Sequence, residues 1–300
     1  MMLLLLLLVL IQIVNGFNIR SSSSSSISLS SSLTMKITPN DISTLTYHVS
    51  DIKRSINFYT DLLGLKLINN KDNSALISLI DNTYIELINN NKQDYNLGDG
   101  FVGIGINKNA IDSNNIIQKC SNYGGNVILD INDFGYGACL IPDEDEMKVT
   151  PVRYGRITDP DGYNIEITEI KDSSSSVIPN IGKIRLNVVD WEESEKFYME
   201  ILGMKLFRRR SNINSKPKKA SITSYLGYNS ESTGTILELT YPYSTDVLDI
   251  GNGYNHIKFT CSDISWTRDK IKTAGIAIDE DNGTSLIIKD PNNYKLILSS

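Results

Sequence analysis

The segment DIKRSINFYTDLLGLKL at residues 51–67 decides the fold, because it occurs twice in the chain. Its second copy is DWEESEKFYMEILGMKL at residues 190–206, and eight positions are identical at a constant spacing of 139 residues. An internal repeat of this kind indicates a duplicated domain. Ile52, Ile56 and Tyr59 share one face of a helix, and the glycine that follows can end it. We therefore predict an amphipathic helix at the same place in each half.

Two further motifs recur at other spacings. The sequence TYIELI at residues 83–88 corresponds to TILELT at residues 235–240, and DPDGY at residues 159–163 corresponds to DPNNY at residues 290–294. The change in spacing between these matches places 22 extra residues in the first copy, near residues 129–151. The duplication thus extends over nearly all of the chain beyond its first 40 residues.

Each half divides into two smaller units, and each unit consists of one strand, one helix and three further strands. In the first half the units begin at residues 44–49 and 101–106, and in the second half they begin at Ile184 and His256. Short β-runs alternate with helical periodicity throughout. Four tandem β-α-β-β-β units predict an α+β fold with curved, largely antiparallel sheets.

The leader differs from the rest of the chain. Residues 1–16 begin with an apolar run that is too short for a membrane span and suits a signal peptide. Residues 17–40 hold ten serines and no acidic residue, which predicts a disordered, transit-like segment. Together they resemble the bipartite plastid leader of algae with secondary plastids; a secreted or endomembrane protein is the alternative. We expect folded domains at residues 41–172 and 181–300, joined by a linker at residues 173–180.

Composition limits the chemistry that the chain can carry out. The net charge of −6 and the pI of about 5.1 argue against nucleic acid as the main partner. Three cysteines are too few for a disulfide scaffold or a structural zinc site. The two histidines exclude a site built from three imidazoles, so any metal site must rely on carboxylates.

The motifs FYxxxLGxKL, LELTY and DPDGYNIE together resemble the vicinal oxygen chelate superfamily. Within it the sequence is most similar to fused, two-domain glyoxalase I (lactoylglutathione lyase), over residues 43–298. The resemblance implies paired units around a divalent metal, zinc or nickel, with the first unit facing the fourth and the second facing the third. It implies glutathione as co-substrate, and a metal-bound carboxylate that moves a proton between adjacent carbons. We expect a monomer with an internal pseudo-dimer and no stable membrane span after processing.

The first candidate site keeps two of the four ligands that this resemblance implies. Glu86 and His256 are retained, whereas Thr44 and Ile297 stand at the other two positions. Glu86 is also a candidate catalytic carboxylate. Divalent metals of this class usually take about four protein ligands, or three and an open position. The alternative is a metal-free, hydrogen-bonded His–Glu pair, which can still carry out acid–base chemistry.

The second candidate site keeps Glu166 and Glu238 as metal ligands, with Glu166 as its candidate catalytic carboxylate, and has Lys183 and Gly103 at the other positions. A protonated lysine has no lone pair to offer a metal. We predict that Lys183 replaces the metal as a cation and pairs with both glutamates, because two facing carboxylates repel each other. The alternative is a lysine of lowered pKa that acts as a base or Schiff-base amine.

Substrate contacts are fewer than the resemblance implies. An arginine of the family falls on His48, and an asparagine of the family is present as Asn90. Arg153 and Arg156 can bind a carboxylate, with a solvated surface as the alternative. The acidic run at residues 143–146 is interpreted as a solvated loop, with a low-affinity cation site as the alternative.

Three functions remain open from the sequence. Lineage predicts a glyoxalase I-like protein of methylglyoxal detoxification. The missing ligands favour a catalytically inactive scaffold that binds a small molecule or a protein partner. A third hypothesis is another enzyme of the same fold that uses His256 and Glu86; an iron dioxygenase is disfavoured because it needs two histidines at one site.

Overall fold

The structure, a computed structural model, describes residues 41–80, 82–90, 96–140, 148–169, 182–212, 220–229, 234–243 and 245–300. These residues belong to one compact unit, Ile37–Ser300. The predicted leader at residues 1–40, the linker at residues 173–180 and the acidic run at residues 143–146 lie outside the described residues. Within the described part, no helix has both the length and the apolar character needed to cross a membrane.

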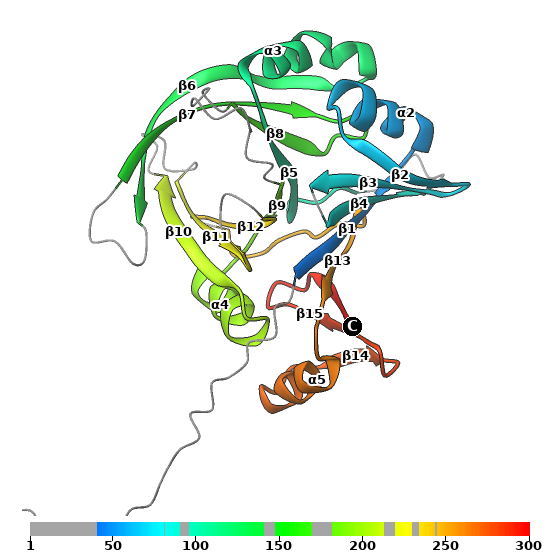
Figure 1. Ribbon diagram of the computed structural model, residues 1–300. Coiled ribbons are helices and arrows are strands. Elements are labelled where there is room, and N and C mark those ends of the chain that lie inside the picture. The colour runs from blue at the N-terminus through cyan, green and yellow to red at the C-terminus, as the bar shows by residue number, and fades with distance from the viewer. Residues whose placement is uncertain are drawn as a thin grey trace, which may run out of the picture. The chain divides into compact units, whose positions relative to one another are not determined.

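The predicted order of one strand, one helix and three strands is confirmed in all four units (Figure 1). The first unit contains β1 (Asp41–Val49), α2 (Ile52–Asn57), η1 (Phe58–Leu62), β2 (Lys66–Lys71), β3 (Ser74–Ile80) and β4 (Thr83–Asn89). The second unit contains β5 (Phe101–Lys108), α3 (Ala110–Lys119), η2 (Cys120–Tyr123), β6 (Asn126–Leu140), β7 (Lys148–Thr158) and β8 (Asn164–Glu169). The third unit contains β9 (Gly182–Asn187), α4 (Trp191–Lys196), η3 (Phe197–Ile201), β10 (Lys205–Asn212), β11 (Ser221–Gly227) and β12 (Ile236–Pro242). The fourth unit contains β13 (Tyr254–Thr260), α5 (Ile264–Thr273), β14 (Ile278–Asp281), β15 (Ser285–Lys289) and β16 (Lys295–Ser299).

The strands form two sheets, and each sheet takes strands from both halves of the chain. The first sheet has the order β14-β15-β16-β13-β1-β4-β3-β2 and combines the first and fourth units. The second has the order β10-β11-β12-β9-β5-β8-β7-β6, combines the second and third units, and closes into a barrel. The expected pairing of first with fourth and second with third units is therefore observed.

The repeated segment forms the predicted helices. Asp51 caps the first, since its carboxylate accepts a hydrogen bond of 3.0 Å from the backbone N–H of Arg54. Asp190 caps the equivalent helix in the second half in the same way. Gly64 and Gly203 follow the helices with φ of 69° and 75°, a conformation that glycine adopts without strain. The last turn of both helices widens into a π-helix, which the sequence analysis did not anticipate.

The helix motif and the DP motif recur together because they contact each other. The hydroxyl of Tyr59 donates to the buried carboxyl of Asp159 over 2.9 Å, and Tyr198 donates to Asp290 over the same distance. Burial raises the pKa of Asp159 to about 7 and that of Asp290 to about 6. Each contact joins the helix of one unit to the next unit, so the two motifs hold each half together.

The extra residues of the first copy extend the hairpin of β6 and β7. The far end of β6 pairs with β10, where Cys139 and Leu140 lie opposite Arg210 and Arg209. This pairing closes the barrel. In the first sheet β2 and β14 remain edge strands, so that sheet stays open.

Aromatic rings pack where the two sheets meet. Tyr47 on β1 lies 5.5 Å from Phe101 on β5 and 4.7 Å from Tyr163, between ring centroids, and Phe101 lies 5.8 Å from Tyr254 on β13. Because side chains alternate along a strand, this packing turns the neighbouring residues of β1 to the opposite face. Thr46 is one of them, and it lies at the first candidate site.

Candidate active and metal sites

The first site brings together the predicted pair of Glu86 and His256, with a threonine between them. Thr46 on β1 lies opposite Glu86 on β4 and opposite His256 on β13. Its hydroxyl donates to Glu86 Oε2 over 3.1 Å and lies 3.3 Å from His256 Nε2. The first-strand residue in contact with the retained pair is therefore Thr46, whereas the sequence analysis had placed that position at Thr44.

The two positions that lack ligands lie two residues away from the Thr46–His256 pair in the strand register. Thr44 and Ile297 are both opposite Lys258 in the strand register. Charges on Lys295 and Lys258 act on His256. Two lysines therefore lie close enough to the first site to influence its histidine.

His256 is neutral, and its Nε2 carries a lone pair. Its Nδ1 lies 2.8 Å from Asn255 Oδ1, an oxygen that only accepts, so the ring proton is assigned to Nδ1. Burial lowers the pKa of His256 to about 4, assisted by the charges of Lys295 and Lys258. At neutral pH Nε2 therefore has a lone pair beside the hydroxyl of Thr46, whose single proton can be donated to Glu86 Oε2 or to His256 Nε2 but not to both.

His48 belongs to the same hydrogen-bond chain. The amide nitrogen of Asn255 lies 3.2 Å from His48 Nε2 and donates to it, and His48 Nδ1 donates to the carbonyl of Asn252 over 2.9 Å. The two histidines of the protein are thus joined through Asn255. His48 is thus a hydrogen-bonded histidine that supports His256 through Asn255, and the substrate contact that the resemblance implies at this position stays a prediction.

The donor set of the first site fits a weakly held divalent ion. A neutral imidazole nitrogen and a carboxylate are good ligands, and a hydroxyl is a weak third. No group of three or more histidine, cysteine, aspartate and glutamate side chains within the described residues could hold a metal. Glu86 and His256 would bind such an ion, and water or substrate oxygens would have to complete its coordination.

The barrel site has a different centre, which the sequence analysis missed. Arg185 on β9 bridges the two glutamates: its Nε lies 2.9 Å from Glu238 Oε1, and its Nη2 lies 3.2 Å from Glu166 Oε2. Lys183 Nζ contacts Glu166 Oε1 at 3.1 Å and Thr168 Oγ1 at 3.2 Å. Lys183 therefore pairs with Glu166 as predicted, but Arg185 occupies the place predicted for it beside Glu238.

A divalent metal does not fit the barrel site. Burial by itself would raise the pKa of Glu166, but the charges of Arg185 and Lys183 outweigh it and lower that pKa to about 2. A carboxylate held this strongly by two cations is a poor general base at neutral pH. A metal ion would have to displace both cations from the glutamates. Glu166 and Glu238 are therefore ion-pair partners here, contrary to the expected metal and catalytic roles.

The barrel ion pairs predict an acid-sensitive contribution to stability. The pKa of Glu166 is about 2 in the folded protein, against an ordinary value of 4.5 for this carboxyl group. A lowered folded-state pKa stabilises above pH 4.5, and this stabilisation, on the order of 3 kcal/mol, is lost as the pH falls toward 2. We expect the difference in unfolding free energy between wild type and Glu166→Gln, measured with urea, to shrink over that range. An equal difference at pH 7 and pH 2.5 would contradict the assignment.

Gly103 lacks a side chain because the backbone leaves no room for one. Its φ is 135°, and a Cβ there would lie 1.8 Å from the carbonyl oxygen of Asn164. Gly105 is similar, since a Cβ would lie 2.9 Å from Cδ of Lys183. Strand β5, on which the resemblance implies a ligand histidine, therefore has no room for a side chain at Gly103 or Gly105.

Replacing Gly103 with alanine is expected to destabilise the protein by at least about 2 kcal/mol more than Gly275→Ala. Gly275 is a matched control, because it also has a positive φ, of 73°, but a Cβ there meets nothing within 4 Å. Urea unfolding of the two variants measures the difference. Equal losses would show that the backbone at Gly103 shifts freely.

The predicted substrate arginines point in opposite directions. Arg156 on β7 lies opposite Glu166 in the barrel, and its charge acts on that carboxylate. Arg153 instead forms an ion pair with Glu169 on the outer face, where Ser113 of α3 also donates to Glu169. Arg153 therefore faces away from the barrel interior, and its role in substrate binding stays a prediction. The backbone N–H of Asn90 donates to the carbonyl of Val49 over 3.0 Å, which ends the pairing of β1 with β4.

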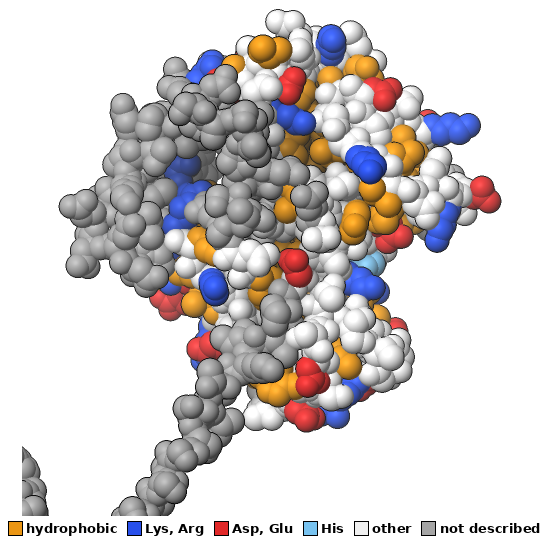
Figure 2. Space-filling model, in the orientation of Figure 1, with side chains coloured by type: hydrophobic (Ala, Val, Ile, Leu, Met, Phe, Trp, Pro, Cys, Tyr) orange, Lys and Arg blue, Asp and Glu red, His pale blue; other side chains and the backbone are white. Residues whose placement is uncertain are grey.

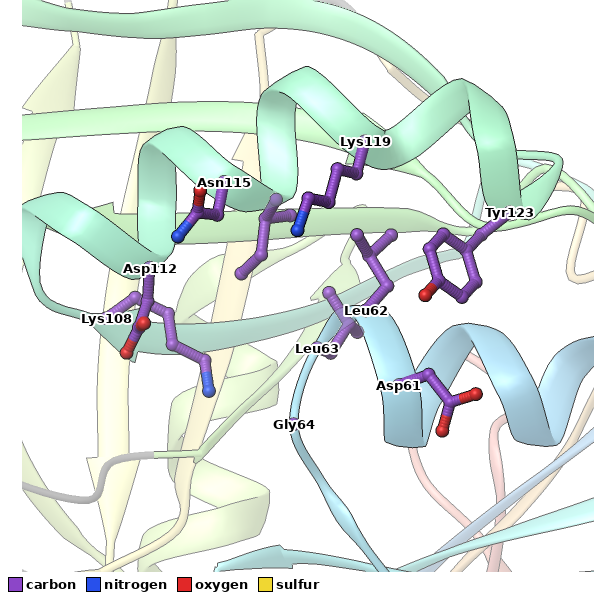
Figure 3. A pocket seen from close by; sticks show the side chains of 10 residues that line it. Asp61, Leu62, Leu63, Gly64, Lys108, Asp112, Asn115, Lys119 and Tyr123 are labelled. Atoms are coloured by element: carbon purple, nitrogen blue, oxygen red, sulfur yellow. The ribbon is translucent and has the colours of Figure 1, made fainter.

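A pocket of about 380 Å³ lies outside both sites, between η1 and α3 (Figure 3). Lys108, Asp112 and Lys119 approach it from the second unit, and Asp61 approaches it from the first. Burial lowers the pKa of Lys108. None of the predicted site residues lines this pocket.

The sequence matches the family model described as Glyoxalase/Bleomycin resistance protein/Dioxygenase superfamily twice, at residues 41–167 and 180–298. The chain therefore belongs to this superfamily. Both halves carry one copy, in agreement with the duplication and with the two sheets.

Similar proteins point to glyoxalase I. A probable chloroplastic lactoylglutathione lyase of Arabidopsis thaliana is 30% identical over 250 residues, which is 80% of this chain and 65% of the relative. The chain thus spans just under two thirds of that relative. A second lactoylglutathione lyase of Arabidopsis thaliana is 26% identical over 76% of both chains. The crystal structure of glyoxalase I from Zea mays matches with a TM-score of 0.66 and 25% identity, over 87% of this chain and 92% of that one. This chain is glyoxalase I-like in sequence and in fold.

Proposed function

We propose that the protein is a lactoylglutathione lyase-type enzyme that acts at the first site, and that its barrel site does not catalyse. The observation that carries the proposal is the contact of Thr46 with both Glu86 and His256. This is the site where a carboxylate and a neutral imidazole nitrogen are both available. The names of the relatives support the reaction class.

Glu86 is the proposed proton carrier. In a hemithioacetal of glutathione and methylglyoxal, a carboxylate would remove the proton from one carbon and return it to the adjacent carbon. Thr46 holds Oε2 of Glu86, so we assign the transfer to Oε1. A divalent metal bound by Glu86 and His256 would supply polarisation of the substrate oxygen.

Lys258 and Lys295 suit an anionic substrate. Their positive charges act on His256. Lys258 is on β13, the strand of His256, and Lys295 is on the neighbouring strand β16. Such charges attract the carboxylates of a glutathione adduct. They would compensate for the arginine that His48 replaces.

The test is turnover of the hemithioacetal by the full chain, followed as formation of the thioester, together with titration of nickel or zinc. Turnover that depends on Glu86 supports the proposal. The sequence hypothesis of an inactive binding scaffold predicts no turnover at millimolar substrate with either metal, and that result would overturn the proposal.

We propose delivery to a plastid, supported by the composition of residues 1–40 and by the name of the chloroplastic relative. We also propose a monomer, because both candidate sites are assembled from units of one chain. Fractionation and sedimentation would test them.

A further inference from the structure

We propose that the interior of the barrel binds a small oxyanion of the phosphate type without a metal. This inference concerns the barrel site alone and does not depend on turnover at the first site. Figure 2 shows Lys and Arg side chains gathered on the barrel side of the molecule.

Alternation along β10 separates inward from outward arginines. Arg208 packs over the ring of Tyr225, with its guanidinium carbon 3.5 Å from the ring centroid. Arg210 lies opposite Thr223 in the register. Arg209, between them, forms an ion pair with Glu195 on the outer face. Arg208 and Arg210 therefore share the inner face, because successive side chains point to opposite sides of a strand.

The inner face carries more positive than negative charge among the described residues. The glutamates there are Glu166 and Glu238. The inward cations are Lys183, Arg185, Arg156, Arg208 and Arg210. Five cations and two carboxylates leave an excess of three positive charges. An interior with this excess favours an anion and opposes a metal ion.

Several buried polar atoms of these residues lack a hydrogen-bond partner within the described part of the chain. They are Arg185 Nη1, Arg156 Nε and Arg210 Nε, all donors, and Glu238 Oε2, an acceptor. Arg185 is only 8% exposed, so its free N–H group is costly unless a ligand or water accepts from it. The donors call for an oxyanion.

The unpartnered oxygen of Glu238 limits which class of oxyanion fits the site. Glu238 Oε2 needs a donor, and hydrogen phosphate offers both an O–H group and acceptor oxygens. A fully ionised dicarboxylate offers acceptors only. Arg156 lies opposite Glu166, which Arg185 contacts, and the charges of Glu166, Arg156, Arg210 and Arg185 all act on the hydroxyl of Tyr154. Phosphate or a phosphate monoester therefore matches the site better than a dicarboxylate.

The experiment is calorimetric titration of the full chain with inorganic phosphate, glycerol phosphate and succinate, in EDTA and at constant ionic strength. We expect saturable binding of one phosphate, with succinate weaker, and the comparison with glycerol phosphate shows whether a free or an esterified group is preferred. Arg210→Gln should weaken phosphate binding at least about 10-fold, the loss of one charge-assisted hydrogen bond. Arg209→Gln, on the same strand but the outer face, should leave the affinity unchanged.

A second variant distinguishes a loss of phosphate binding from a loss of folding. Arg156→Gln on β7 should weaken phosphate binding in the same way, and circular dichroism establishes that each variant is folded. The proposal is overturned by the absence of saturable phosphate binding, by equal affinities of wild type and both inward variants, or by succinate that binds more tightly than phosphate. Stoichiometric nickel binding that is lost in Glu238→Gln would also overturn it.

Discussion

Glu86→Gln is expected to lower kcat for the glutathione hemithioacetal by about 10²- to 10⁴-fold, the usual contribution of a positioned general base. Glutamine has nearly the same shape, and its carbonyl oxygen can still accept the hydrogen bond from Thr46. It cannot take up the substrate proton. Because the change removes the proton carrier and little else, the loss should fall on kcat more than on KM.

The matched control is Glu280→Gln on the exposed strand β14, where kcat should not change. Since the pKa of His256 is about 4, His256 stays neutral from pH 6 to 8, and the rate should show no step from its titration there. Thioester formation measured by absorbance, with metal content determined on the same sample, tests both statements. Undiminished turnover in Glu86→Gln would show that Glu86 is not the proton carrier and would contradict catalysis at the first site.

Arg185→Met is expected to destabilise the protein by about 3–5 kcal/mol, which is typical when one partner of a buried ion pair is removed. Arg185 bridges Glu166 and Glu238, and the side chains of all three are at most 14% exposed. Without the guanidinium, Glu238 loses its ion-pair partner and Glu166 keeps Lys183. The methionine fills similar volume, so the loss reports charge more than packing.

Two further variants show whether charge is the cause. Arg185→Met combined with Glu238→Gln should recover part of the loss, because the neutral amide does not need a cation. Arg268→Met, which breaks the surface pair with Asp281, should change stability little. Urea unfolding at pH 7 measures all of them. A loss below about 1 kcal/mol in Arg185→Met would show that water solvates the barrel glutamates and that the network is weak.

The two sheets have the same unit order but carry different groups at their candidate sites. In the open sheet the carboxylate and the imidazole face each other across Thr46, and no guanidinium of the described residues contacts either of them. In the barrel Arg185 stands between the carboxylates. The extended hairpin of β6 and β7 closes the second sheet into a barrel but does not pair with the first sheet. The cationic interior therefore belongs to the sheet that is closed.

The sequence by itself predicted the four units and the glycine that follows each repeated helix, and the family resemblance placed Glu86 and His256 at one site. The units and the helix ends follow from local periodicity and from the repeat, since residues of equal spacing adopt equal structures. It also indicated correctly that Lys183 contacts Glu166. The contact of the tyrosines with the DP motif could have been inferred, because both motifs recur in both halves.

What only the tertiary structure decided is which residue of each first strand reaches the opposite carboxylates. Thr44 and Thr46 share one face of β1, as Lys183 and Arg185 share one face of β9, because the side-chain period of a strand is two. Periodicity therefore cannot choose between them. The register between strands makes that choice, and it selected Thr46 beside Glu86 and Arg185 beside Glu238. One site thereby kept a carboxylate beside a neutral imidazole, and the other became an ion-paired, cationic interior.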